Sequence, residues 1–182
     1  MEPLVGREVL LREYREEDIV EIYEWTKDRN TTRWMGPRYR SQRALEEIQA
    51  SVRKVMLAPP ADAIFFVIAD RTTEKYFGGI DLTAIDLIDR NAVLSIVISK
   101  KANRNRGIGT DAIRTLLDFV FNEMNLHKVE LGVDSNNEWA VKCYQKVGFK
   151  IEGVIRDHTF IDGRYSNLYK MGILETEFPG NE

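Results

Sequence analysis

The apolar positions in the first third of the chain predict one strand and two helices. Residues 8–14 are typical of a strand, and residues 16–27 repeat apolar side chains at the three- and four-residue spacing of a helix. A second helix is expected to follow Ser41, its N-cap, and to run to about residue 57, because a proline pair comes next. Residues 29–43, which include a Gly-Pro pair, are expected to form a loop.

The spacing then changes to that of strands. Residues 63–70, 76–85 and 92–99 are apolar runs separated by short polar turns, which predicts an antiparallel meander of three strands. The last run is apolar almost without interruption, as expected of a strand in a sheet that is covered on both faces.

Helices and strands alternate in the second half of the chain. Residues 107–123 form a strongly amphipathic pattern, followed by a strand over 128–134 and a helix over 137–146 that ends at a glycine. Two further strands are expected over 149–158 and 165–174. The predicted fold class is therefore mixed α/β, with a mostly antiparallel sheet flanked by helices.

Composition narrows the class of protein. Residues 1–182 are expected to form one domain, and a net charge of -3 argues against nucleic acid as a partner. The single cysteine, Cys143, excludes an intrachain disulfide and a cysteine-rich zinc site, and no apolar run is long enough for a membrane helix. The first residues carry no signal-peptide pattern, so we expect a cytoplasmic protein without a metal centre.

A glycine-rich turn, residues 104–110, carries the clearest functional signal. Its glycines allow successive backbone N–H groups to point into one concavity, and the helix that follows adds a partial positive charge. With two arginines beside it, the turn is expected to bind a pyrophosphate, although it could also be a purely structural helix start. Its members are Arg104, Asn105, Arg106, Gly107, Ile108, Gly109 and Thr110.

The same glycines fit a relaxed dinucleotide-binding fingerprint, Gly107-x-Gly109-x-x-Ala112, with Asp134 at a later strand end. Three features argue against NAD as the ligand. The linker between the strand and the first glycine is long, few residues follow Asp134, and the preceding strands look like an antiparallel meander.

Several motifs in order and spacing resemble the GCN5-related N-acetyltransferase (GNAT) family. The turn resembles the acetyl-CoA pyrophosphate motif of that family, Arg/Gln-x-x-Gly-x-Gly/Ala, and residues 137–149 resemble its second signature. Residues 152–165 are similar to the RimJ/RimL and spermidine-acetyltransferase branch. The resemblance is strong over residues 92–174 and weak over residues 29–76.

This resemblance implies the GNAT acyl-CoA N-acyltransferase fold, with acetyl-CoA as co-substrate. It makes Tyr144 the general acid that protonates the departing thiolate, a role that suits a phenol of pKa about 10; its apolar neighbours are also typical of a core tyrosine. Asn137 and Tyr144 share a helix face about 10 Å apart along the axis, which suits the pantetheine arm. The implied cofactor-binding residues are those of the glycine-rich turn together with Ile96, Val97, Ile98, Asn137 and Lys146.

The residue that takes the proton from the acceptor amine is left open. Many family members carry a glutamate in the strand that matches residues 92–98, and here that strand has no carboxylate. Glu130, Asp134 and Asp81 are alternatives that would act through water. At pH 7 a free α-amine is roughly a tenth neutral and a lysine-type amine on the order of 0.04%, so a weak base favours an α-amine acceptor.

Five arginines in the segment 29–43 favour the same acceptor, because by resemblance this segment borders the acceptor groove. Their charge would repel a polyamine and attract a neutral-to-acidic amine. They could instead cap helices or pair with acidic residues, just as Trp34 and Tyr39 could contact an acceptor or anchor the segment. The five are Arg29, Arg33, Arg38, Arg40 and Arg43.

The sequence thus predicts an acetyl-CoA-dependent N-acetyltransferase. Its expected acceptor is a protein or peptide N-terminal α-amine or a neutral-to-acidic small amine. A polyamine acetyltransferase and a non-catalytic acyl-CoA-binding module are the alternatives. Neither nucleic acid nor a membrane is an expected partner, and a homodimer is one option because dimers are frequent in the resembled branch.

Overall fold

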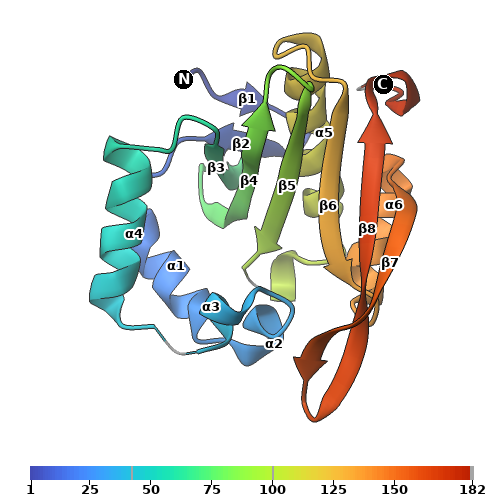
Figure 1. The fold of residues 1–182 in the computed structure, drawn as a ribbon. Helices are drawn as coiled ribbons and strands as arrows, with labels where there is room; N and C mark the ends of the chain where they lie inside the picture. Colours follow the sequence, from blue (N-terminus) through green and yellow to red (C-terminus); the bar gives the residue numbers. More distant parts are fainter. Residues whose placement is uncertain (42, 100, 181–182) are drawn as a thin grey trace.

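The computed structural model describes residues 1–41, 43–99 and 101–180. Within these ranges the strands form one eight-stranded sheet: β1 (Leu4–Val5), β2 (Val9–Arg12), β3 (Ile64–Asp70), β4 (Tyr76–Asp86), β5 (Asn91–Ile98), β6 (Lys128–Asp134), β7 (Lys150–Ile161) and β8 (Arg164–Leu174). The strand order is β1-β2-β3-β4-β5-β6-β8-β7 (Figure 1). Every neighbouring pair is antiparallel except β5 and β6, which confirms the predicted fold class.

The helices are α1 (Asp18–Thr26), α2 (Arg29–Thr32), α3 (Pro37–Arg40), α4 (Leu45–Leu57), α5 (Ile108–Asn122) and α6 (Glu138–Val147). Single 3₁₀ turns lie at Lys101–Asn103 and Glu175–Glu177. None of these helices is long and apolar enough to cross a membrane, as far as the described residues go. The antiparallel meander β3-β4-β5 before the glycine-rich turn is incompatible with a dinucleotide-binding sheet.

The prediction of a loop over residues 29–43 is wrong, because the segment contains the short helices α2 and α3. Asp28 caps α2, because its carboxylate accepts a hydrogen bond from the backbone N–H of Asn30 at 3.0 Å. A proline in its first turn starts α3, and Ser41 follows that helix in extended conformation. Ser41 is therefore not the N-cap of α4, which begins after Ala44 without a side-chain capping bond.

The larger hydrophobic core lies between one face of the sheet and helices α5 and α6. Apolar side chains of β2 to β6 and β8 meet the buried stripe of α5 there, including Ile113, Leu116 and Leu117 at 0% exposure. The helical spacing of the sequence predicts this stripe, and the strands supply the alternate positions that face it.

A smaller core holds α1 and α4 against the opposite face, over β3 and β4. Besides apolar residues such as Trp25 and Val67, this region contains a buried ion pair between Arg12 and Asp18. The cover does not extend over all of β5, where Ser95 is exposed. The expectation that β5 is covered on both faces is therefore wrong at Ser95, where the strand is open to solvent, whereas Val97 on the same face packs against the smaller core.

Candidate functional site

The parallel strands β5 and β6 separate along their length. Their pairing is limited to Asn91 with Lys128, Ala92 with Val129 and Val93 with Glu130. From Leu94 onward β5 stays paired with β4 alone, so the edge that includes Ile96, Val97 and Ile98 faces a gap. Backbone groups along such an edge are available to a ligand that runs beside the strand.

The glycine-rich turn closes one end of this gap. Gly107 is the N-cap of α5 with φ of 83°, and Asn105 has φ of 60°, so the backbone curls through the left-handed region just before the helix. A side chain at Gly109 would lie 3.8 Å from the Cγ1 of Ile98 and 3.7 Å from the Sγ of Cys143. The end of β5, the start of α5 and the face of α6 therefore meet at this glycine.

The two arginines of the turn have different surroundings. The guanidinium of Arg104 donates to the backbone carbonyl of Ile98 and, at 2.6 Å, to the hydroxyl of Thr31 in α2. Arg106 is exposed and makes no hydrogen bond or ion pair within the described ranges. Arg104 thus ties the turn to α2, whereas Arg106 is free to meet an anion at the positive end of α5.

Tyr144 is buried at the interface of α6 and the sheet. Its ring packs edge-on against Phe149, with the centroids 5.9 Å apart, and its hydroxyl makes no hydrogen bond with any residue that the structure describes. Burial raises the pKa of the Tyr144 phenol well above its ordinary value, with a smaller contribution from Cys143. The phenol therefore keeps its proton at neutral pH and can donate it.

Asn137 and Lys146 lie near the two ends of α6. Asn137 is the N-cap, and its side-chain oxygen accepts a hydrogen bond from the backbone N–H of Ala140 at 3.4 Å. Lys146 is exposed in the last turn. Cys143 lies between them along α6, and its thiol is 3.5 Å from the hydroxyl of Thr110 on α5, a contact that joins the two helices.

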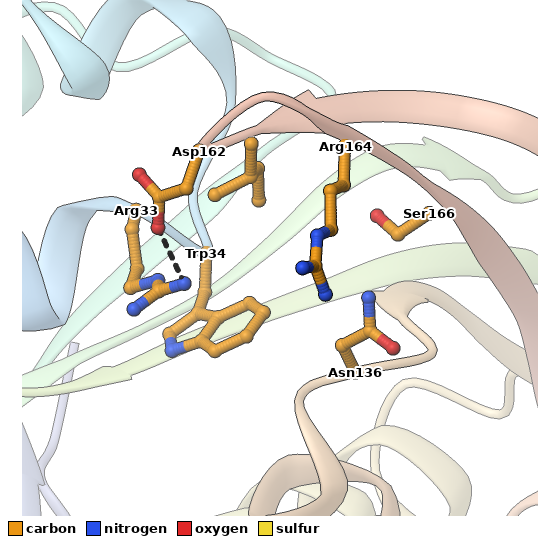
Figure 2. Close-up of a pocket in the computed structure, with 7 residues that line it drawn as sticks. Arg33, Trp34, Asn136, Asp162, Arg164 and Ser166 are labelled. Atoms are coloured by element: carbon orange, nitrogen blue, oxygen red, sulfur yellow. Dashed lines mark ion pairs between the residues drawn. The ribbon is translucent and has the colours of Figure 1, made fainter.

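A hollow of about 320 Å³ lies where the segment after α2 meets the β7–β8 hairpin. Figure 2 shows the guanidinium groups of Arg33 and Arg164 on either side of the Trp34 indole, with Arg164 directed toward Asn136. The guanidinium of Arg164 makes no hydrogen bond or ion pair with the residues described. The lining is completed by Ile161, Asp162 and Ser166.

Asp162, at the tip of the hairpin, forms ion pairs with two of the five arginines of segment 29–43. Its carboxylate pairs with Arg33 at 2.7 Å and with Arg29 at 3.1 Å. Arg40 donates to the carbonyl of Phe160, so a third arginine also contacts the hairpin.

The other aromatic and basic residues of this segment either anchor it to α1 and α4 or line the hollow. Arg43 donates to Ser51 and the Glu47 carbonyl on α4. The side chain of Arg38 lies outside the described part. Tyr39 stacks on Trp25 and anchors the segment, whereas Trp34 lines the hollow.

Sequence reasoning missed Asp162 and Arg164 as site residues. Both belong to the hairpin, and nothing local to residues 161–166 indicates that they meet a segment 133 positions earlier in the chain. Among the described residues, no group of His, Cys, Asp and Glu side chains could hold a metal ion.

Comparison with known proteins agrees with this geometry. Residues 8–150 match the family described as "Acetyltransferase (GNAT) domain". Spermidine N(1)-acetyltransferase of Escherichia coli (strain K12) is 35% identical over 101 residues, which cover 56% of this chain and 54% of that protein. The putative ribosomal N-acetyltransferase YdaF of Bacillus subtilis is 30% identical over 58% of this chain and 57% of that protein. The matches thus span only about half the length of these curated relatives.

A solved structure extends the similarity over nearly the whole chain. The crystal structure of spermidine N-acetyltransferase from Vibrio cholerae, in complex with CoA and spermine, has a TM-score of 0.81 at 27% identity. It covers 93% of this chain and 97% of that one. The sequence motifs and the sheet with its β5–β6 gap are consistent with the family match. The chain therefore belongs to the GNAT acetyltransferase domain family.

Proposed function

We propose that this chain is an N-acetyltransferase that moves an acetyl group from acetyl-CoA to a primary amine. The observation that carries the proposal is the gap between β5 and β6, which opens directly beside the glycine-rich turn and the start of α5. A thioester arm in this gap would have its pyrophosphate at the positive end of a 15-residue helix. The relative from Vibrio cholerae was solved with CoA, which supports the same co-substrate here.

Each residue around the gap has a role in this proposal. The edge of β5 at Ile96 and Val97 offers backbone groups to the pantetheine arm, and Arg106 with the first N–H groups of α5 meets the pyrophosphate. Tyr144 protonates the thiolate as it leaves, since its buried phenol is neutral and has no partner among the described residues. Arg104 positions the turn, because its guanidinium is already bound to Ile98 and Thr31.

Two acceptor classes compete for the second substrate. The relatives favour a polyamine, because spermidine acetyltransferases are prominent among the similar sequences and structures, and this supports the polyamine alternative over our expectation of an α-amine.

The hollow at the hairpin favours a neutral-to-acidic amine. Its lining includes Arg33 and Arg164 against the single carboxylate of Asp162, which also pairs with Arg29. A polycation is repelled by such a lining, whereas a carboxylate can accept hydrogen bonds from Arg164.

Release of the CoA thiol tests the enzyme and the acceptor together. The assay uses acetyl-CoA with spermidine, with a peptide that begins with an acidic sequence, and with the same peptide N-terminally blocked. Turnover of a free amine, with none of the blocked peptide, is the expected result. A higher kcat/KM for spermidine than for the acidic peptide would decide for the polyamine. Binding of acetyl-CoA with no turnover of any amine would instead support the non-catalytic module.

A further inference from the structure

Asp81 in β4 is a carboxylate without a partner. Its Oδ1 is buried and accepts no hydrogen bond, and the side chain makes no ion pair with any described residue. Its neighbours in the strand, Ile80 and Leu82, are fully buried in the core under α5. Because side chains alternate along a strand, Asp81 points to the opposite face of the sheet.

That face is open beside Asp81. In the antiparallel register Asp81 lies opposite Ser95 of β5, which is exposed, and opposite Phe65 of β3. Ser95 follows the last residues at which β5 and β6 are paired, so it stands where the gap opens. Neighbouring strands are about 4.8 Å apart, so Asp81 is one strand away from the edge that the thioester would follow.

The groups that face Asp81 are phenols rather than cations. The Tyr14 hydroxyl lies over Gly79, 2.9 Å from where a side chain at that glycine would begin, on the same face as Asp81. The negative charge of Asp81 contributes to the raised pKa of both Tyr14 and Tyr76. No lysine, arginine or histidine of the described chain lowers the pKa of Asp81 in return. Burial therefore raises the pKa of Asp81 to about 7.

We propose, resting on the function proposed above, that Asp81 is the base that takes the proton from the acceptor amine, through a bridging water. It supplies from β4 the carboxylate that β5 lacks. Asp81 as a whole is half-buried, but a carboxylate oxygen that is buried without a partner is costly to the fold, and such a cost is typical of a functional site.

The proton balance assigns one proton to each side of the sheet. An acceptor ammonium passes one proton to Asp81, and the neutral amine attacks the thioester carbon. The C–N bond forms and the C–S bond breaks, with the electron pair leaving on sulfur. Tyr144 protonates the thiolate, so that CoA leaves as the thiol. The second proton, which the nitrogen loses as the amide forms, passes through water to the Tyr144 phenolate and restores the phenol. Asp81 then returns its proton to solvent.

The variant Asp81→Asn tests the role, with Asp89→Asn as the matched control. Asp89 is exposed in the turn after β4, and its carboxylate makes no hydrogen bond or ion pair with any residue that the structure describes. We expect kcat to fall about 100-fold in Asp81→Asn and less than about twofold in Asp89→Asn. In the wild type, kcat should fall on the acid side with an apparent pKa near 7 that does not follow the pKa of the acceptor amine.

Two further readouts separate a base from a structural residue. Since the folded state holds a carboxylate of raised pKa, its ionised form destabilises the fold above pH 7, and Asp81→Asn should melt at the same temperature as wild type or higher at pH 8. Carboxyl-carbon NMR of the wild type should show Asp81 titrating near neutrality.

Full turnover by Asp81→Asn, or titration of Asp81 near pH 4, would overturn the role of Asp81 and leave the proposed function standing. Loss of turnover together with a lower melting temperature would show a structural role instead. A wild type that acetylates no amine would overturn both proposals.

Discussion

The two halves around the gap are built in different ways. The half that would hold the cofactor consists of β4, β5, β6, α5 and α6, and it is packed by the larger apolar core. The half that would hold the acceptor consists of α1 to α4 and the tip of the β7–β8 hairpin. It has a smaller core, a buried ion pair and several charged contacts between segments far apart in the chain.

This difference indicates where specificity resides. Apolar packing and the start of a helix depend on backbone shape more than on particular side chains, so the cofactor half does not need particular charged residues to keep its shape. Charged contacts at the hairpin depend on single residues, and under the proposed function they would determine which acceptor is attracted or repelled. The comparison predicts that substitutions in the first half change rate, and those in the second half change acceptor choice.

The largest expected effect on stability lies in the acceptor half. Asp18 accepts two hydrogen bonds of 2.8 Å from Arg12, and the two side chains are 2% and 4% exposed. Asp18→Asn leaves the Arg12 charge buried and should lower the free energy of unfolding by about 3 to 5 kcal/mol. Denaturant unfolding measures this, with Glu24→Gln, which breaks an exposed pair, as the control. A change below about 1 kcal/mol would show that this core does not depend on the ion pair.

The next effect tests the cofactor half. Tyr144→Phe removes the phenolic proton but keeps the packing against Phe149, so we expect kcat to fall about 100-fold with unchanged binding of acetyl-CoA. Tyr165→Phe, on the exposed part of the hairpin, is the control and should keep the wild-type rate. Equal rates for Tyr144→Phe and wild type would make Tyr144 a core residue only.

A smaller effect on acceptor choice is expected at the hairpin hollow. Arg164→Gln removes an unpaired guanidinium and should raise KM about tenfold for a carboxylate-bearing amine, with kcat and acetyl-CoA binding unchanged. The exposed Arg156 on the same hairpin provides the control, Arg156→Gln. If both variants shift KM alike, the hollow has no specific role and only net charge matters.

The smallest effect is on the contact that joins the hairpin to α2. Asp162 is 46% exposed, so Asp162→Asn should cost no more than about 1 kcal/mol of stability, and less at high salt. The same variant frees Arg29 and Arg33, so KM for an anionic amine should fall slightly. An unchanged KM, measured at low salt, would place the acceptor elsewhere.

The sequence predicts the cofactor half far better than the acceptor half. The amphipathic stripe of α5, the turn around Gly107 and the helix end at Gly148 are local patterns, and the structure has all three. The hollow depends on Arg33 meeting Asp162, a contact between distant segments that no local pattern reveals. The open face beside Asp81 could not be predicted either. The apolar sequence of β5 is typical of a covered strand, and it does not reveal that α1 and α4 pack over β3 and β4 and leave Ser95 exposed.

Thermal unfolding with and without acetyl-CoA tests the central claim, that the β5–β6 gap and the glycine-rich turn form the cofactor site. At about 100 times the dissociation constant, linkage predicts about 2.7 kcal/mol of stabilisation. For a chain of 182 residues this raises the melting temperature by roughly 5 to 10 °C. We predict this shift with acetyl-CoA and none with NAD. A shift with NAD alone, or no shift with either ligand, would contradict the account.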